Sequence, residues 1–125
     1  MFHLPVTTTV AALTTFMLIA LSLNVSRLRM RYRTSLGDAG HKDLQVAVRA
    51  HGNALEQALL FLSLLLIAEL QVVNPVLLAG GSIVFLAARC AHAYGLLTGR
   101  LRLRQVGHGA TLLVQLLLAS ALLLG

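Results

Sequence analysis

The sequence contains no tryptophan and few charged residues. Aromatic residues make up only 5% of the 125 residues and charged residues 11%, whereas 58% are hydrophobic. A soluble domain of this size needs far more charge to cover its surface, so this composition argues against a soluble protein and favours a membrane protein. The absence of tryptophan also means that the aromatic belts common at membrane interfaces are weak here.

Cysteine and acidic residues are scarce as well. The single cysteine, Cys90, excludes an internal disulfide, and no two His or Cys residues have metal-ligand spacing on one helix face, so we predict no metal. With four acidic and ten basic residues the net charge is +6. The basic residues lie beside apolar runs, which argues against nucleic acid as a partner and favours anionic lipid headgroups or an anionic ligand.

Four apolar segments account for most of the chain, and each is long enough to span a bilayer at about 20 residues per helix. They cover about residues 5–25, 44–72, 74–97 and 104–124. We therefore predict an all-α fold, a transmembrane four-helix antiparallel bundle that forms a single domain over residues 1–125. Glycines at 80 and 81 and at 107 and 109 favour close helix contacts.

The basic residues are distributed unevenly along the chain. All ten lie in, or within about three turns of, the first and third connections, residues 27–43 and 98–104. The positive-inside rule then places both basic loops in the cytoplasm and both termini on the periplasmic side. The second connection, residues 73–75, is so short that the segments before and after it must form an antiparallel hairpin. Glu69, near this turn, is expected to be an ordinary interfacial charge.

The second and third segments carry polar side chains at similar depth. At 100° per residue, Arg49, Asn53 and Glu56 fall within about 60° of one another and form one polar stripe. Counted from the hairpin turn, Glu56 and Arg89 lie within roughly 3 Å of the same depth. An unpaired charge in hydrocarbon costs at least ~2.5 kcal/mol, so we predict an Arg89–Glu56 ion pair with Asn53 and His92 beside it.

One carboxylate cannot neutralise all the basic groups that converge on this end of the bundle. These groups are Arg27, Arg29, Arg49, Arg89, Arg100, Arg102 and Arg104. A buried Arg–Glu pair can simply hold membrane helices together. The surplus of guanidinium groups, however, favours a ligand that carries carboxylates.

The stretch RAHGNALE, Arg49 to Glu56, resembles the R-x-H-x-N-x-x-E signature in the second helix of the MAPEG family. These are the membrane-associated proteins of eicosanoid and glutathione metabolism. The ending of the first segment, SRLRMRYR (26–33), the RCAH at 89–92 and Arg104 are also similar to the family pattern, most of all to its short bacterial branch. The resemblance implies a homotrimer with twelve spans in a bacterial inner membrane, which binds glutathione between adjacent subunits.

The resemblance also implies roles for individual residues. Arg104 would face the glutathione sulfur as the catalytic residue, Glu56 would accept from the amino group of the tripeptide, and Arg89 would orient Glu56. The implied glutathione-binding residues are Arg27, Arg49, Asn53, Glu56, Arg89, His92 and Tyr94. Gly52 and Leu96 stand where the prostaglandin-synthase members have a basic residue and a tyrosine, so we do not expect prostaglandin synthase activity.

The implied function is a glutathione S-transferase or peroxidase that acts on lipophilic electrophiles or hydroperoxides. A free thiol has a pKa of about 8.5, so a guanidinium near the sulfur favours the reactive thiolate. Two alternatives stay open: a small multidrug-type four-span transporter that uses Glu56 as its embedded acid, and a non-catalytic membrane scaffold of the same fold. The sequence identifies neither the electrophile nor the roles of Tyr94 and His108.

Overall fold

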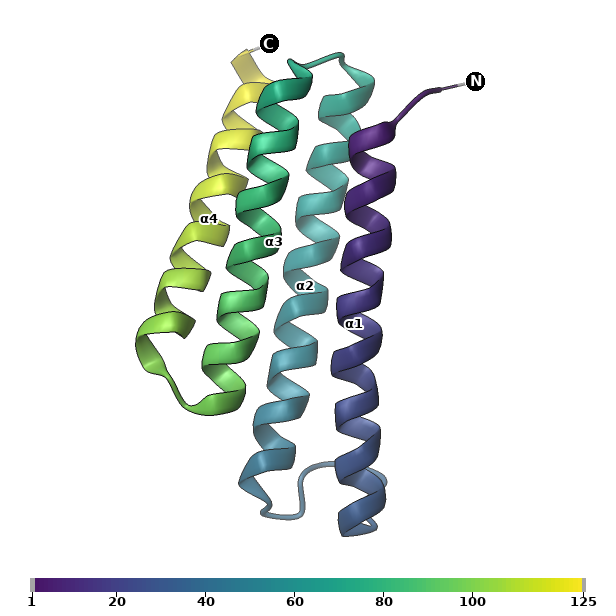
Figure 1. Cartoon of the computed structure of the whole chain (residues 1–125), viewed down its shortest axis with the longest axis vertical. Helices are drawn as coiled ribbons and strands as arrows, with labels where there is room; N and C mark the ends of the chain where they lie inside the picture. Colours follow the sequence, from purple (N-terminus) through teal and green to yellow (C-terminus); the bar gives the residue numbers. More distant parts are fainter. Residues whose placement is uncertain (1, 125) are drawn as a thin grey trace.

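The computed structural model describes residues 2–124 as four long helices (Figure 1). They are α1 (Pro5–Tyr32), α2 (Lys42–Leu70), α3 (Pro75–Thr98) and α4 (Leu101–Leu124). Residues 2–124 contain no strand, and all four helices are long and apolar enough to cross a membrane. The predicted all-helical, four-span architecture is therefore confirmed. The two ends of the predicted domain, residues 1 and 125, lie outside the described residues.

The helices lie side by side and run alternately up and down (Figure 1). α2 contacts each of the other three helices, and α3 and α4 form the most extensive contact. Both ends of the chain lie at one end of the bundle, and the α1–α2 and α3–α4 connections lie at the other (Figure 1). The two basic connections therefore share one end of the bundle, as the charge pattern predicts.

α1 is longer than its apolar segment. It continues from the predicted end near Val25 through the basic stretch RLRMRY to Tyr32. Arginine, leucine and methionine are good helix formers, so the helix need not end where the hydrocarbon ends. It ends at Arg33, whose φ of 49° is left-handed and whose backbone N–H bonds back to the last turn.

α4 begins at Leu101 and not at Arg104 as predicted. Gly99 follows α3 in a left-handed conformation, with φ of 75°, and reverses the chain at once. The connection between α3 and α4 is therefore only two residues long, Gly99 and Arg100. As a result, Arg104 lies at the end of the first helical turn and not in a loop.

α3 and α4 approach closely because glycines lie at their contact. A Cβ atom on Gly107 would lie 2.6 Å from the carbonyl oxygen of Ala88 and from the amide nitrogen of His92, and one on Gly95 would lie 2.5 Å from the amide nitrogen of Arg104. Small residues allow helix backbones to come this close. This contact holds His92 beside the first turns of α4.

Within the single subunit, the other glycines make no such close contacts. A Cβ atom on Gly80 or Gly109 would meet nothing within 4 Å, and one on Gly81 would be in ordinary van der Waals contact, 3.8 Å from Val114. A glycine pattern marks helix faces that can approach, but only the helix rotation decides which of them do. Elsewhere the core is apolar, with the rings of Phe61 and Phe85 stacked at 4.0 Å between α2 and α3.

Glu69 joins α1 to α2 at the end opposite the basic connections. Its two carboxylate oxygens accept hydrogen bonds from the backbone N–H groups of Val6, at 3.1 Å, and Thr7, at 3.2 Å. The first amides of a helix have no partner within the helix and carry partial positive charge, which a carboxylate satisfies. The expectation of an ordinary interfacial charge is therefore wrong, because Glu69 caps the N-terminus of α1.

Candidate functional site

Arg89 links three helices from the middle of the bundle. Its side chain is 1% exposed. Its Nη1 atom donates to Oδ1 of Asn53 on α2 at 2.6 Å, and its Nε atom donates to Oγ1 of Thr111 on α4 at 3.0 Å. The Thr111 hydroxyl in turn donates to the carbonyl of Gly107 at 2.8 Å. Arg89 therefore fixes both the amide of Asn53 and the position of α4.

The predicted Arg89–Glu56 ion pair is wrong for the single subunit. Arg89 bonds to Asn53 and Thr111, and its remaining nitrogen, Nη2, is buried without a hydrogen-bond partner. Glu56 is exposed on the outside of α2. Equal depth along two helices does not make two side chains face each other, because each helix also has its own rotation. Arg89 points into the bundle and Glu56 points out of it.

A polar pocket of about 320 Å³ lies next to this buried arginine, between α2, α3 and α4. Its lining residues are Asn53, His92, Leu101, Arg104, Gln105 and His108. The buried ring of His92 faces that of His108, with 6.2 Å between the ring centroids. These six residues include a guanidinium, two imidazoles and two amides but no carboxylate. The pocket therefore offers positive charge and N–H donors, which suit an anionic group.

The polar stripe of α2 extends from this pocket onto the open surface of the bundle. Asn53 is half-buried and lines the pocket, whereas Arg49 and Glu56, on the same helix face, are exposed. Glu56 is the midpoint of α2, about 21 Å from either helix end at 1.5 Å per residue. A lone subunit would therefore hold a carboxylate against hydrocarbon, at a cost of at least ~2.5 kcal/mol. A polar neighbour packed against this face of α2 would remove that cost.

Five of the eight predicted site residues do not line the polar pocket of their own subunit, and two of these five, Arg27 and Tyr94, lie away from it. Arg27, on α1, donates from Nη2 to Oδ1 of Asn24 at 2.9 Å and borders a different pocket. Tyr94 is 52% exposed on α3, and its ring lies 5.8 Å from the guanidinium carbon of Arg100. Asn53, Arg89, His92 and Arg104 are thus brought together, and the other predicted residues lie around or away from them.

Comparison with known proteins identifies the family of this chain. Residues 7–124 match the model of the MAPEG family. The chain belongs to the MAPEG family. It is also similar to a protein named "Inner membrane protein YecN" in two strains of Escherichia coli, with 38% identity over 111 residues that cover 89% of this chain and 85% of the relative. The predicted family is confirmed, and the relative's name describes a location and no activity.

In this MAPEG protein, α4 contributes polar residues to which the sequence alone assigned no role. His108 and Thr111 follow Arg104 by four and seven residues, so all three lie on one helix face. Gln115 continues this face and donates to Oε1 of Gln57 on α2 at 2.9 Å. The helical period of the sequence contains this signal. Residues at spacings of four and seven from Arg104 lie on its face of the helix.

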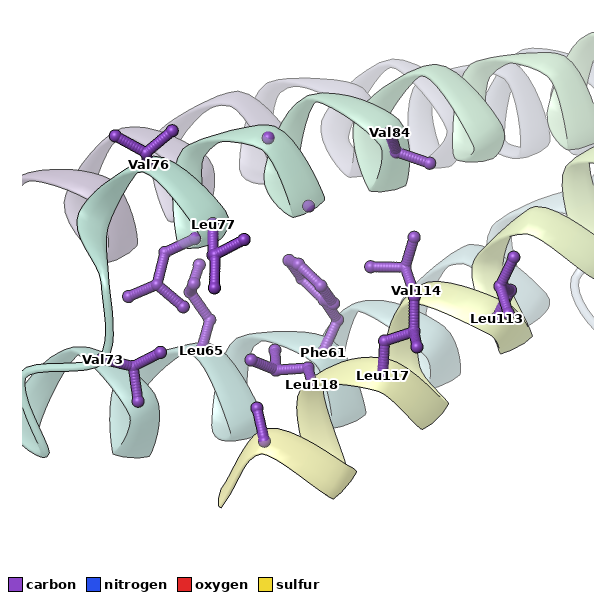
Figure 2. A pocket seen from close by; sticks show the side chains of 14 residues that line it. Phe61, Leu65, Val73, Val76, Leu77, Val84, Leu113, Val114, Leu117 and Leu118 are labelled. Carbon is purple, nitrogen blue, oxygen red and sulfur yellow. The ribbon is translucent and has the colours of Figure 1, made fainter. Parts of the chain in front are cut away.

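Another pocket of this MAPEG protein, of about 450 Å³, is entirely apolar (Figure 2). It lies toward the chain ends, where Phe61 and Leu65 of α2, Val84 of α3 and Val114 and Leu117 of α4 line it (Figure 2). Such a lining can hold hydrocarbon but offers no group that binds or activates a polar reactant. This pocket is therefore no candidate for reactive chemistry.

The Arg89 contacts give a first testable prediction. Thr111→Val preserves the shape of the side chain but removes the acceptor for Arg89 Nε, in a residue whose Nη2 already has no partner. Leaving a buried charged donor unpaired costs about 1–3 kcal/mol. We expect the free energy of unfolding in detergent to fall by about that amount in a reversible denaturation experiment.

Thr15→Val is the matched control for this substitution. Thr15 is exposed, and its hydroxyl donates to the carbonyl of Ala11 at 2.7 Å, as that of Thr111 does to Gly107. This variant therefore loses the same bond within a helix but no contact with Arg89, and should change stability by less than about 0.5 kcal/mol. Equal losses in the two variants would show that the link between Arg89 and α4 contributes nothing.

Proposed function

We propose that this chain is a glutathione-dependent membrane enzyme of the transferase or peroxidase type. The observation that carries the proposal is that Asn53 belongs both to the pocket with Arg104 and to the α2 face with Arg49 and Glu56. One elongated ligand can therefore place a thiol in the pocket and its charged ends along α2. Glutathione, with one thiol, one ammonium group and two carboxylates, has groups that complement each of these side chains.

In this proposal each polar side chain has a role that follows from its place. Arg104 faces the sulfur from α4, Glu56 accepts from the ammonium group, and Arg49 binds a carboxylate bidentately. Asn53 bonds to the peptide backbone of the ligand beside His92. Arg89 is a positioning residue, but it holds the amide of Asn53 and not the carboxylate of Glu56.

The chemistry depends on the charge of the pocket. A guanidinium and two imidazoles without a carboxylate lower the free energy of an anion, so they favour the thiolate over a thiol whose free pKa is about 8.5. The thiolate attacks a lipophilic electrophile that arrives from the bilayer, and a thioether forms as the leaving group departs. With a hydroperoxide it attacks the O–O bond and gives a sulfenic acid and an alcohol, after which a second glutathione yields the disulfide and water.

The proposal includes a homotrimer of twelve spans in the inner membrane, the location given by the relative's name. In a trimer, the exposed face of α2 with Glu56 is covered by a neighbouring subunit, which removes the cost of a carboxylate against lipid. Arg27, which does not line the pocket of its own subunit, would then contact glutathione bound to the adjacent one. The basic connections face the cytoplasm and both termini the periplasm.

Binding of glutathione in detergent tests the proposal. We expect isothermal titration calorimetry at millimolar glutathione to show one site per subunit, and Glu56→Gln to weaken it about tenfold because a charge-assisted bond to the ammonium group is lost. Glu69→Gln removes the same charge from the far end of α2 and should leave binding unchanged. If the wild-type protein binds no glutathione at millimolar concentration, the proposal is wrong.

The transporter alternative shares the membrane-embedded Glu56 but needs a different pocket. The polar pocket contains no aromatic ring apart from its two imidazoles, whereas a drug-binding cavity favours aromatic walls. Proton-coupled efflux from vesicles without glutathione, lost in Glu56→Gln, would support the transporter. Binding of glutathione without formation of its thiolate would support a non-catalytic scaffold.

A further inference from the structure

A second charged pocket, of about 640 Å³, lies at the end of the bundle with the basic connections, between α1, α2 and the end of α3. Its rim carries three cations, Arg27, Arg31 and Lys42. Its walls include the apolar side chains of Leu28, Val46 and Leu96. It shares no lining residue with the polar pocket around Arg104, and Arg27 is its one lining residue with a role in the proposed glutathione site.

The acid beside these cations offsets only part of their charge. Asp43 also borders the pocket, but its Oδ2 atom accepts from the hydroxyl of Tyr32 at 2.7 Å and its Oδ1 atom from the backbone N–H of Leu44 at 2.9 Å. Its oxygens are therefore committed to local bonds. Three cations against one carboxylate leave the rim with positive charge.

Ring stacking holds together the two helix ends that carry two of these cations. The rings of Tyr32 and His41 stack with centroids 3.6 Å apart and planes 8° apart. Arg31 at the end of α1 and Lys42 at the start of α2 are the chain neighbours of these two rings, and the guanidinium carbon of Arg31 lies 5.5 Å from the centroid of the Tyr32 ring. Nη1 of Arg29 donates to the carbonyl of Gly37 at 2.7 Å and holds the connection itself. The backbone that carries both cations is therefore held in place, so less entropy is lost when an anion binds.

The depth of the pocket matches the headgroup region of a bilayer. α1 and α2 contain 28 and 29 residues, so each is about 42 Å long or more at 1.5 Å per residue, against about 30 Å for the hydrocarbon core. They extend beyond α3 and α4 at this end (Figure 1). The cations therefore lie at headgroup level, and the apolar walls continue toward the hydrocarbon.

We propose that this pocket binds one anionic phospholipid, with its phosphate group between Arg31 and Lys42 and its acyl chains against Leu28, Val46 and Leu96. Basic pockets between membrane helices at this level suit such headgroups. Free phosphate would gain nothing from the apolar walls, and a neutral lipid would gain nothing from the surplus charge. This proposal does not rest on the proposed glutathione site, because the phosphate group lies between Arg31 and Lys42, and Arg27 is the one cation of this rim that is assigned to glutathione.

Native mass spectrometry of the detergent-purified protein tests the proposal, with phosphatidylglycerol and phosphatidylcholine of the same acyl chains as probes. We expect one phosphatidylglycerol per subunit, and weak binding of phosphatidylcholine. In Arg31→Gln/Lys42→Gln the affinity for phosphatidylglycerol should fall roughly 30-fold, about fivefold for each cation. Neither residue has a role in the proposed glutathione site, so glutathione binding should stay unchanged.

The control removes the same charge elsewhere on this end of the bundle. Arg33 and Arg102 are exposed and line neither pocket, so Arg33→Gln/Arg102→Gln should retain the lipid. Equal losses in the two double variants would reduce the effect to general surface attraction and overturn the proposal. Displacement of the lipid by millimolar inorganic phosphate would also overturn it.

Discussion

Replacing Arg104 by alanine should abolish the glutathione thiolate while most of the binding affinity remains. Arg104 is the guanidinium of the polar pocket, whereas the proposed contacts to the charged ends of glutathione come from α2. Without this cation, the pKa of the bound thiol should rise toward the free value of about 8.5, so thiolate forms only at higher pH. We expect kcat/KM at neutral pH to fall about 10²–10³-fold, as when a group that stabilises developing negative charge is removed.

The ultraviolet absorbance of the thiolate, followed as glutathione is added at several pH values, measures this effect directly. Arg102→Ala is the control, because Arg102 is exposed two residues earlier on α4 and does not line the pocket. It should retain the thiolate signal of the wild-type protein. An unchanged signal in Arg104→Ala, or the same loss in both variants, would remove Arg104 from the proposed chemistry.

Gly107→Ala should destabilise the protein strongly and disrupt the pocket. The new Cβ atom would lie 2.6 Å from backbone atoms of Ala88 and His92, and backbone atoms of a packed helix cannot move aside as a flexible side chain does. α3 and α4 would have to separate, which also moves His92 away from Arg104. We expect a loss of about 3 kcal/mol in the free energy of unfolding, together with loss of glutathione binding.

Gly109→Ala, two residues further along α4, is the control for this prediction, because we expect no loss of stability in this variant. Its Cβ atom would meet nothing within 4 Å, and alanine favours a helix over glycine by up to about 1 kcal/mol. Reversible unfolding in mixed detergents should therefore show Gly109→Ala as stable as the wild-type protein or more stable. Losses of similar size in both variants would contradict the close contact between α3 and α4.

Most of the fold can be predicted from the sequence because a bilayer imposes strong constraints. Apolar length identifies the four spans, and the short turn at 73–75 makes a hairpin of α2 and α3. The helix ends are less predictable, since hydropathy marks where the hydrocarbon ends and not where hydrogen bonding ends. For this reason α1 runs on to Tyr32, and Arg104 lies within α4.

The site is only partly predictable for a related reason. Periodicity within one helix places Arg49, Asn53 and Glu56 on one face of α2, and the structure agrees. The partner of Arg89 depends on how two helices are rotated against each other, which periodicity does not contain. A buried guanidinium can also donate hydrogen bonds to a neutral amide and to a hydroxyl. Arg89 therefore bonds to Asn53 and not to Glu56 because of where these side chains point, and not because of their charge.

The central claim is that one thiol-bearing anion spans the polar pocket and the exposed face of α2. An experimentally determined structure of the protein with glutathione, in lipid nanodiscs, tests it most directly. The account predicts three subunits, with each sulfur within about 3.5 Å of the guanidinium of Arg104 and each ammonium group on Glu56. Glutathione bound elsewhere, or an assembly in which Glu56 faces lipid, would contradict it.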